Sequence, residues 1–234
     1  MIPWRELGRA VLPEGDAPLI LSQRGTEFAI RIGATALMSS LAHGSEEMLA
    51  ELACVGLADH ADARVLIGGL GMGFTLAAAL RQLPPSAQVL VAELMPAVLE
   101  WNRGPLSHLA QEPLQDPRVA VVVTDVGEVI RAKESAWDVI LLDVDNGPSG
   151  LTRASNDQLY SEPGLKFVHA ALRAHGVLAV WSVAPDAGFT RRLEHSRFDV
   201  HETAVRSRRT KGGWHTLWIA TARSGPSSAT GKAS

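Results

Sequence analysis

The chain has 234 residues, of which 46% are hydrophobic and 20% are charged, and its 22 basic and 25 acidic residues leave a net charge of −3. A chain of this length can bury a large hydrophobic core and needs no disulfide or metal ion to stabilise it. Its single cysteine, Cys54, excludes an internal disulfide framework. The mildly acidic charge argues against nonspecific binding to nucleic acid. No apolar run is long enough to span a membrane and no signal peptide opens the chain, so we expect a cytoplasmic, globular protein.

The first 62 residues predict a small β-meander followed by a helix. Three short apolar segments separated by glycine-containing turns are the expected strands: 19–22, 27–32 and 35–38. A helix is expected over 45–58, where apolar residues recur at helical spacing. The unpaired edge of the meander is a surface on which two copies of the chain could pair, so a homodimer is one expected assembly.

The middle of the chain alternates between short apolar runs and segments of helical length. The runs are 64–68, 88–93, 118–125, 137–143 and 176–183. They are too short for helices and too uniformly apolar for half-exposed strands, which is typical of parallel strands buried on both faces. The helices expected between them are 73–82, 95–110, 126–132 and 161–174. This alternation predicts an α/β protein with a doubly wound, mostly parallel Rossmann-like sheet.

The pattern changes after the fifth strand of this series. A helix over 186–196 and strands over 198–206 and 214–222 predict an antiparallel C-terminal hairpin. Its connection carries Arg206, Arg208, Arg209 and Lys211, which are either solvated or able to bind an acidic acceptor or partner. We therefore expect an N-terminal unit over 1–62, a Rossmann-like domain over 63–223, and a disordered polar tail over 224–234.

The ends of the first three core strands carry residues suited to binding a nucleoside. In an open sheet of this kind, ligands bind beyond the carboxyl ends of the strands. The first strand runs into a turn with Gly69, Gly71 and Gly73, where the backbone can approach a ligand closely at the start of a helix. The next two strands end at Glu93, which can accept hydrogen bonds from a ribose diol, and at Asp125, which can accept one from a purine amino group.

The fourth strand ends at Asp143, followed by Asp145, and both are candidates for taking or orienting the proton of a nucleophile. Any one of these acids could simply cap a helix, but together they favour a nucleoside cleft. The G-x-G-x-G spacing does not match a dinucleotide fingerprint, and neither a P-loop nor a nucleophile elbow is present. The histidines and Cys54 lack ligand spacing, so no metal site is expected.

These segments resemble class I S-adenosylmethionine-dependent methyltransferases and, more narrowly, spermidine synthases and their relatives. The resemblance rests on the glycine turn 68–73, the segment 91–96, the segment 116–119 with Asp125, and the strand 137–143, and it extends over roughly residues 40–185. It implies that S-adenosylmethionine or its decarboxylated form is the cofactor. It also implies that Glu93 holds the ribose hydroxyls, that Asp125 holds the adenine amino group, and that Asp143 faces the reacting centre.

The chain departs from the aminopropyl-transferring members of that group where they hold the donor amine. Gly71 replaces the aspartate of their G-G-G-D-G-G turn, and Asn146 replaces the second acid of their D-x-x-D-P motif. The leading hypothesis is therefore methyl transfer to a small-molecule acceptor, with no nucleic-acid or membrane partner. The alternatives are aminopropyl transfer from decarboxylated S-adenosylmethionine to putrescine or a related diamine, and a non-catalytic nucleoside-binding protein.

Overall fold

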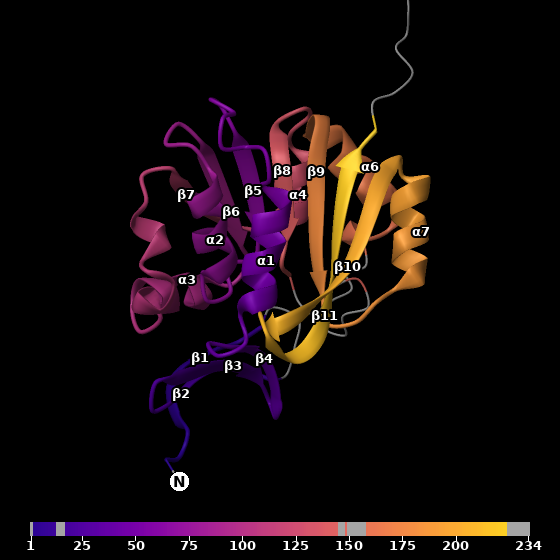
Figure 1. Cartoon of the computed structure of the whole chain (residues 1–234). Helices are drawn as coiled ribbons and strands as arrows, with labels where there is room; N and C mark the ends of the chain where they lie inside the picture. Colours follow the sequence, from indigo (N-terminus) through magenta and orange to yellow (C-terminus); the bar gives the residue numbers. More distant parts are fainter. Residues whose placement is uncertain (1, 13–16, 145–147, 149–157, 224–234) are drawn as a thin grey trace, which may run out of the picture.

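The computed structural model describes residues 2–12, 17–144, 148 and 158–223, which form two β-sheets and the helices that cover the larger one (Figure 1). Asp145, one of the expected catalytic acids, Asn146, and the expected disordered tail over 224–234 lie outside the described residues.

The larger sheet has seven strands in the spatial order β10-β11-β9-β8-β5-β6-β7. Its strands are β5 (Arg64–Gly68), β6 (Gln88–Glu93), β7 (Val119–Val123), β8 (Trp137–Leu142), β9 (Leu172–Ser182), β10 (Phe198–Arg208) and β11 (Lys211–Ala222). Strands β5 to β9 pair in parallel, whereas β11 is antiparallel to both β9 and β10. The prediction of a doubly wound, mostly parallel sheet with an antiparallel C-terminal hairpin is confirmed.

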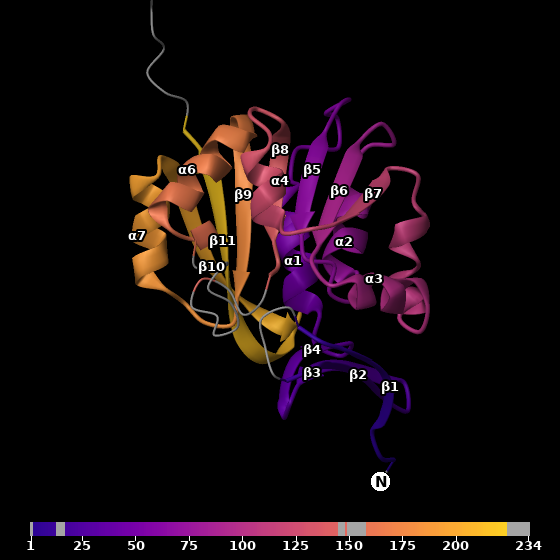
Figure 2. The ribbon, with the colours of Figure 1, turned by 180° about the vertical axis from the view of Figure 1, so that it is seen from behind.

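Helices cover both faces of this sheet, as Figures 1 and 2 show from opposite sides. One face carries α1 (Gly44–Ala53), α2 (Phe74–Gln82) and α3 (Pro96–Arg103), and the other carries α4 (Val126–Arg131), α6 (Glu162–Ala171) and α7 (Ala187–His195). Successive residues of a central strand enter opposite layers: Val65 and Ile67 pack in one core and Leu66 in the other. This explains why the central strands are apolar throughout. None of the described helices has the length and apolar character that crossing a membrane requires.

The helix expected over 95–110 ends early. α3 stops at Arg103, and the chain continues as two 3₁₀ turns, Ser107–Ala110 and Pro113–Gln115. The cause is Pro105, because a proline disfavours the helical conformation in the residue before it.

The smaller sheet is a four-stranded antiparallel meander in the order β1-β2-β3-β4. Its strands are β1 (Arg5–Ala10), β2 (Leu19–Arg24), β3 (Glu27–Ile32) and β4 (Thr35–Ser39). The sequence did not predict β1, whose residues alternate poorly between polar and apolar. Gly8 in β1 packs directly on α3, since a Cβ at this position would lie 2.5 Å from Nε1 of Trp101. A side chain there would push the meander away from the core.

The meander lies against the carboxyl edge of the large sheet (Figure 1). At this edge the strand order reverses between β5 and β8, which is where open α/β sheets bind ligands. Helix α1, although it precedes β5 in the chain, packs on α2 and on the β9–β11 part of the large sheet. The proposed division of the chain at residue 62 remains a prediction.

Candidate functional site

A cleft separates the meander from the carboxyl edge of the large sheet. The meander side and its flanking segment are apolar, formed by Leu12, Leu19, Ile30, Ile32, Leu37 and Met38. The sheet side brings together five of the residues expected to form the site: Gly69, Gly71, Glu93, Asp125 and Asp143. The cleft therefore has one water-excluding wall and one wall of backbone and carboxylates.

The glycine turn between β5 and α2 depends on backbone conformations that favour glycine. Gly69, Gly71 and Gly73 all have positive φ, at 85°, 53° and 84°. A Cβ on Gly69 would lie 2.5 Å from the carbonyl oxygen of Asp143, so the turn sits directly on the end of β8. Gly73 is the N-cap of α2 and is not among the residues that line the cleft.

Glu93, the last residue of β6, is buried with only 6% of its surface exposed. Its Oε2 accepts a hydrogen bond of 2.8 Å from the Leu70 amide and its Oε1 accepts one of 2.7 Å from the Met95 amide. Each carboxylate oxygen has a second lone pair that can accept from a ligand hydroxyl. Glu93 therefore fastens the glycine turn to β6 and also lines the cleft.

Asp125 caps a helix and also lies in the wall of the cleft. Its Oδ1 accepts a hydrogen bond of 2.6 Å from the Gly127 amide, so it is the N-cap of α4. Asp125 also lines the cleft, beside Thr124 and Val126. Capping uses one oxygen and leaves the other able to accept from a ligand.

Asp143 follows β8 at the point where the strand order reverses. Its Oδ2 accepts a hydrogen bond of 2.8 Å from Oγ1 of Thr75, a residue in the first turn of α2. Burial raises the pKa of Asp143 to about 6, and the Thr75 hydroxyl opposes that rise. A carboxylate with this pKa accepts a proton near neutral pH better than an ordinary aspartate does.

Glu46 is a second carboxyl beside Asp143 that the sequence analysis did not assign to the site. It lies in the first turn of α1 and is partly buried. Burial, and then the charge of Asp143, raise the pKa of Glu46 well above its usual value. Burial and the neighbouring negative charge therefore both disfavour the ionised form of Glu46. In sequence, Glu46 is the first of two consecutive glutamates at a helix start, which predicts only a favourable helix dipole.

The basic connection of the C-terminal hairpin is partly engaged within the chain. Arg209 makes ion pairs with Glu47 at 3.0 Å and with Glu51 at 2.5 Å, both on α1. The guanidinium of Arg206 lies 3.8 Å from the ring centroid of Trp214. The ion pairs of Arg209 fasten the hairpin to α1, whereas the Arg206–Trp214 contact lies within the hairpin. Both support a structural role for this loop.

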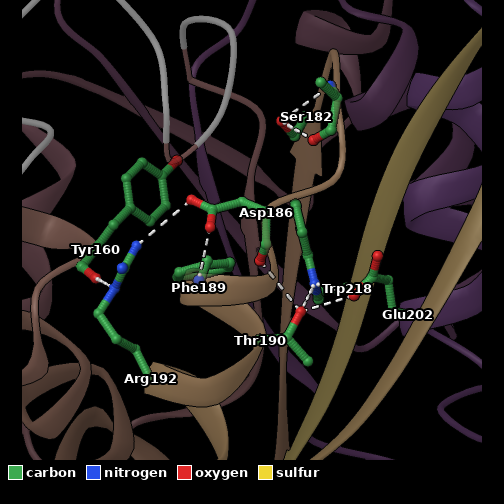
Figure 3. Close-up of polar contacts among 9 residues, drawn as sticks. Tyr160, Ser182, Asp186, Phe189, Thr190, Arg192, Glu202 and Trp218 are labelled. Atoms are coloured by element: carbon green, nitrogen blue, oxygen red, sulfur yellow. Dashed lines mark hydrogen bonds and ion pairs between the residues drawn. The ribbon is translucent and has the colours of Figure 1, made fainter.

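A separate polar cluster lies on the other face of the sheet, beneath α7 (Figure 3). The indole of Trp218 donates to Oγ1 of Thr190 at 2.8 Å, and this hydroxyl donates to Glu202 at 2.6 Å. Asp186 caps α7 by accepting from the Phe189 amide at 2.9 Å. The cluster secures α7 to β10 and β11 and lies apart from the residues that line the cleft.

Comparisons with known proteins agree with this architecture. The protein-family model described as the spermine/spermidine synthase domain matches residues 42–186. No curated protein matches the chain.

Solved structures with a similar fold include spermidine synthases and a methyltransferase-like protein. The spermidine synthase from Thermotoga maritima has 20% sequence identity and a TM-score of 0.73, with 93% of this chain and 72% of that chain covered. A spermidine synthase in complex with the transition state analogue AdoDATO has 19% identity, a TM-score of 0.72 and the same coverage. Human methyltransferase-like protein 13 in complex with SAH has 20% identity and a TM-score of 0.56, with 77% of this chain and 82% of that chain covered.

The family match extends over more than half of the chain and includes α1, the glycine turn and the ends of β6, β7 and β8. The resemblance noted in the sequence is thereby confirmed. The chain belongs to the spermine/spermidine synthase domain family and is a transferase of the S-adenosylmethionine-related type.

Proposed function

We propose that this protein transfers an alkyl group from an S-adenosylmethionine-type sulfonium to an amine of a small molecule. The nucleoside of the donor would lie over β5, β6 and β7, where Glu93 can accept from the ribose hydroxyls and Asp125 from the adenine amino group. Support for this placement comes from the convergence of both acids and the glycine turn on one cleft. The apolar wall of the meander would exclude water from the reaction.

The observation that carries the choice of donor is the Glu46–Asp143 pair. In the proposed orientation the tail of the donor extends from the nucleoside past Gly71 toward this pair. Two carboxyls attract the ammonium of the tail and repel a carboxylate. The pair therefore favours decarboxylated S-adenosylmethionine, and with it aminopropyl transfer. Glu46 would supply the second acid that is absent at Gly71.

Asp143 is the proposed proton acceptor in this reaction. As the amine attacks, the new N–C bond forms while the C–S bond breaks and methylthioadenosine leaves with the bonding electrons. The proton lost by the amine passes to the Asp143 carboxylate, whose raised pKa suits that transfer near neutral pH. The activated donor requires little else beyond alignment of the two reactants.

Methyl transfer from S-adenosylmethionine is the second candidate function. It is favoured by Gly71, where aminopropyl-transferring relatives carry an aspartate and where Sδ of Met38 would lie 3.3 Å from an added Cβ. The turn itself therefore presents an apolar neighbour, and no carboxylate, to the tail of the donor.

The two candidates leave different products. The protein is incubated with each donor and a panel of small amines, and the nucleoside products are separated by chromatography and identified by mass spectrometry. We expect methylthioadenosine from decarboxylated S-adenosylmethionine, and we expect the Glu46→Gln variant to release it more slowly. Release of S-adenosylhomocysteine instead would establish methyl transfer, and binding of a donor without either product would indicate a non-catalytic nucleoside-binding protein.

A further inference from the structure

The buried hydroxyl of Ser45 links Trp181 of β9 and His215 of β11, two strands that follow β8 in the order of the large sheet. Ser45, in the first turn of α1, is fully buried. Its Oγ lies 3.0 Å from Nε1 of Trp181 in β9 and 2.7 Å from Nδ1 of His215 in β11. The rings of Trp181 and His215 meet edge to face, with centroids 4.6 Å apart.

The hydrogen-bonding capacities of these three groups determine where the protons lie. An indole N–H can only donate, so Oγ of Ser45 accepts from Trp181. The hydroxyl oxygen has a second lone pair, so this contact alone does not orient the Ser45 proton. Among the described residues, Nδ1 of His215 is the acceptor within hydrogen-bond distance of this fully buried hydroxyl, so the Ser45 proton is donated to Nδ1. A neutral imidazole that accepts at Nδ1 carries its own proton on Nε2. Burial also lowers the pKa of His215, which favours the neutral ring.

The place of His215 in the sheet puts it beyond the proposed reacting centre. His215 lies on β11, one residue before the Thr216–Ser182 pair at the carboxyl end of β9. Its side chain is on the α1 face, as are those of Leu217 and Ile219. From β8 through β9 to β11 there are two strand spacings, or about 10 Å. The nucleoside residues Glu93 and Asp125 lie on the opposite side of β8.

We propose that His215 binds an oxygen at the far end of the acceptor, which is therefore an amino alcohol or amino acid and not a diamine. This inference rests on the proposed function, because it takes the reacting amine to lie at Asp143. An extended four-carbon chain with a hydrogen bond at one end reaches about 9 Å. That length matches the separation between the end of β8 and β11.

The proton on Nε2 of His215 determines which functional group the acceptor can carry at the end away from its reacting amine. An alkylammonium group carries only donors, so its encounter with the Nε2–H of His215 places donor against donor. A hydroxyl or carboxylate oxygen accepts that proton. His215 thereby selects between acceptors that have the same length and the same reacting amine.

Three four-carbon amines test this selection: putrescine, 4-aminobutan-1-ol and 4-aminobutanoate. With decarboxylated S-adenosylmethionine as donor, we expect kcat/KM for the better of the two oxygen-bearing amines to exceed that for putrescine about ten-fold, the effect of one well-placed hydrogen bond. The His215→Phe variant should lose this preference, and His215→Gln, whose amide still donates, should keep part of it. His201→Gln, at an exposed position on β10, is the matched control and should leave the preference unchanged.

Nuclear magnetic resonance of the full chain with ¹⁵N-labelled imidazoles provides a readout that does not need turnover. The His215 signals, assigned by their loss in His215→Phe, should report a proton on Nε2 and a bare Nδ1. Ser45→Ala removes the hydroxyl that donates to Nδ1 and should give a mixture of tautomers. With methylthioadenosine present, an oxygen-bearing amine should shift the Nε2 signal more than putrescine does.

A proton on Nδ1 in the wild-type protein would overturn the proposal, and so would a preference for putrescine that survives in His215→Phe. Equal effects of all three amines on the Nε2 signal would overturn it as well. Absence of any nucleoside product with every acceptor, alongside the expected Nε2 response, would instead contradict the proposed function. The two failures are therefore distinguishable.

Discussion

The two faces of the large sheet carry similar polar clusters that end in different groups. On the α7 face, the Trp218 indole donates to Thr190, which donates to the exposed carboxylate of Glu202. On the α1 face, the Trp181 indole donates to Ser45, whose proton points to His215. A carboxylate only accepts, so the first chain of hydrogen bonds ends there.

The cluster on the α1 face ends in His215, which can donate a hydrogen bond as well as accept one. A neutral imidazole accepts at one nitrogen and donates from the other, so His215, which accepts the Ser45 proton at Nδ1, carries its own proton on Nε2. The same pairing of indole and hydroxyl therefore secures a helix on one face and orients a donor on the other. The identity of the terminal residue decides between them.

The largest expected effect is on the Trp218 cluster. Trp218 is fully buried and packs edge to face on Phe189 at 5.1 Å. Trp218→Ala should lower the free energy of unfolding by about 3–5 kcal/mol because it leaves a large cavity. Denaturant unfolding measures this loss, and calorimetry with methylthioadenosine should find an unchanged affinity in the folded variant. A weakened affinity would mean that this face also serves the site.

Glu93 tests the nucleoside side of the cleft. Glu93→Ala removes the carboxylate that would accept from the ribose hydroxyls, and the affinity for methylthioadenosine should fall about one-hundred-fold. Calorimetry with this ligand is informative because it is independent of the group transferred. Glu93→Gln keeps one acceptor oxygen and should lose less of the affinity for methylthioadenosine than Glu93→Ala does. An unaltered affinity in Glu93→Ala would refute the placement of the nucleoside.

Asp143 gives a pH dependence of stability whose sign is determined by its raised pKa. The pKa of Asp143 is about 6 in the folded protein, against an ordinary value of 3.8. The stability that this shift contributes is therefore complete below about pH 4 and is lost as the pH rises through 6. Relative to Asp143→Asn, the wild-type free energy of unfolding should fall by on the order of 2 kcal/mol between pH 4 and pH 7. Trp218→Phe, which leaves Asp143 intact, should follow the wild-type dependence. Parallel curves for wild type and Asp143→Asn would contradict the raised pKa.

The smallest expected effects come from a matched pair of hydroxyl deletions. Ser45→Ala leaves the Trp181 indole N–H without its acceptor and should cost about 1–2 kcal/mol of stability. Thr190→Val should cost less, because the Trp218 indole keeps Oε2 of Glu202 as an acceptor at 3.1 Å. Only Ser45→Ala should reduce kcat/KM, since only Ser45 orients His215. Equal activity in the two variants would remove the functional distinction between the clusters.

Most of the large sheet was predictable because its strands are buried on both faces. The expected bounds 64–68 and 88–93 agree with β5 and β6, where apolar residues stop abruptly at the turns. β1 was missed because its residues Arg5–Ala10 lie at an edge and are mostly accessible, so burial imposes no alternation on them. The expected helix over 95–110 was too long because Pro105 ends α3 at Arg103.

The candidate site was predictable only where each residue follows directly from a strand end. Glu93, Asp125 and Asp143 were expected in the cleft and line it. Glu46 and Ser45 come from α1, and no local pattern shows that this helix packs on β8 and β9. His215 depends on a contact across 170 residues of sequence, between Ser45 and the hairpin. Such contacts arise from the packing of α1 on the sheet.

The central claim is that the Glu46–Asp143 pair selects the donor, and titration calorimetry with the two donors tests it most directly. At neutral pH we expect decarboxylated S-adenosylmethionine to bind at least about ten-fold more tightly than S-adenosylmethionine, because only the latter brings a carboxylate to the pair. The Glu46→Gln variant should show a smaller difference between its affinities for the two donors. Tighter binding of S-adenosylmethionine by the wild-type protein would contradict this account and would favour methyl transfer.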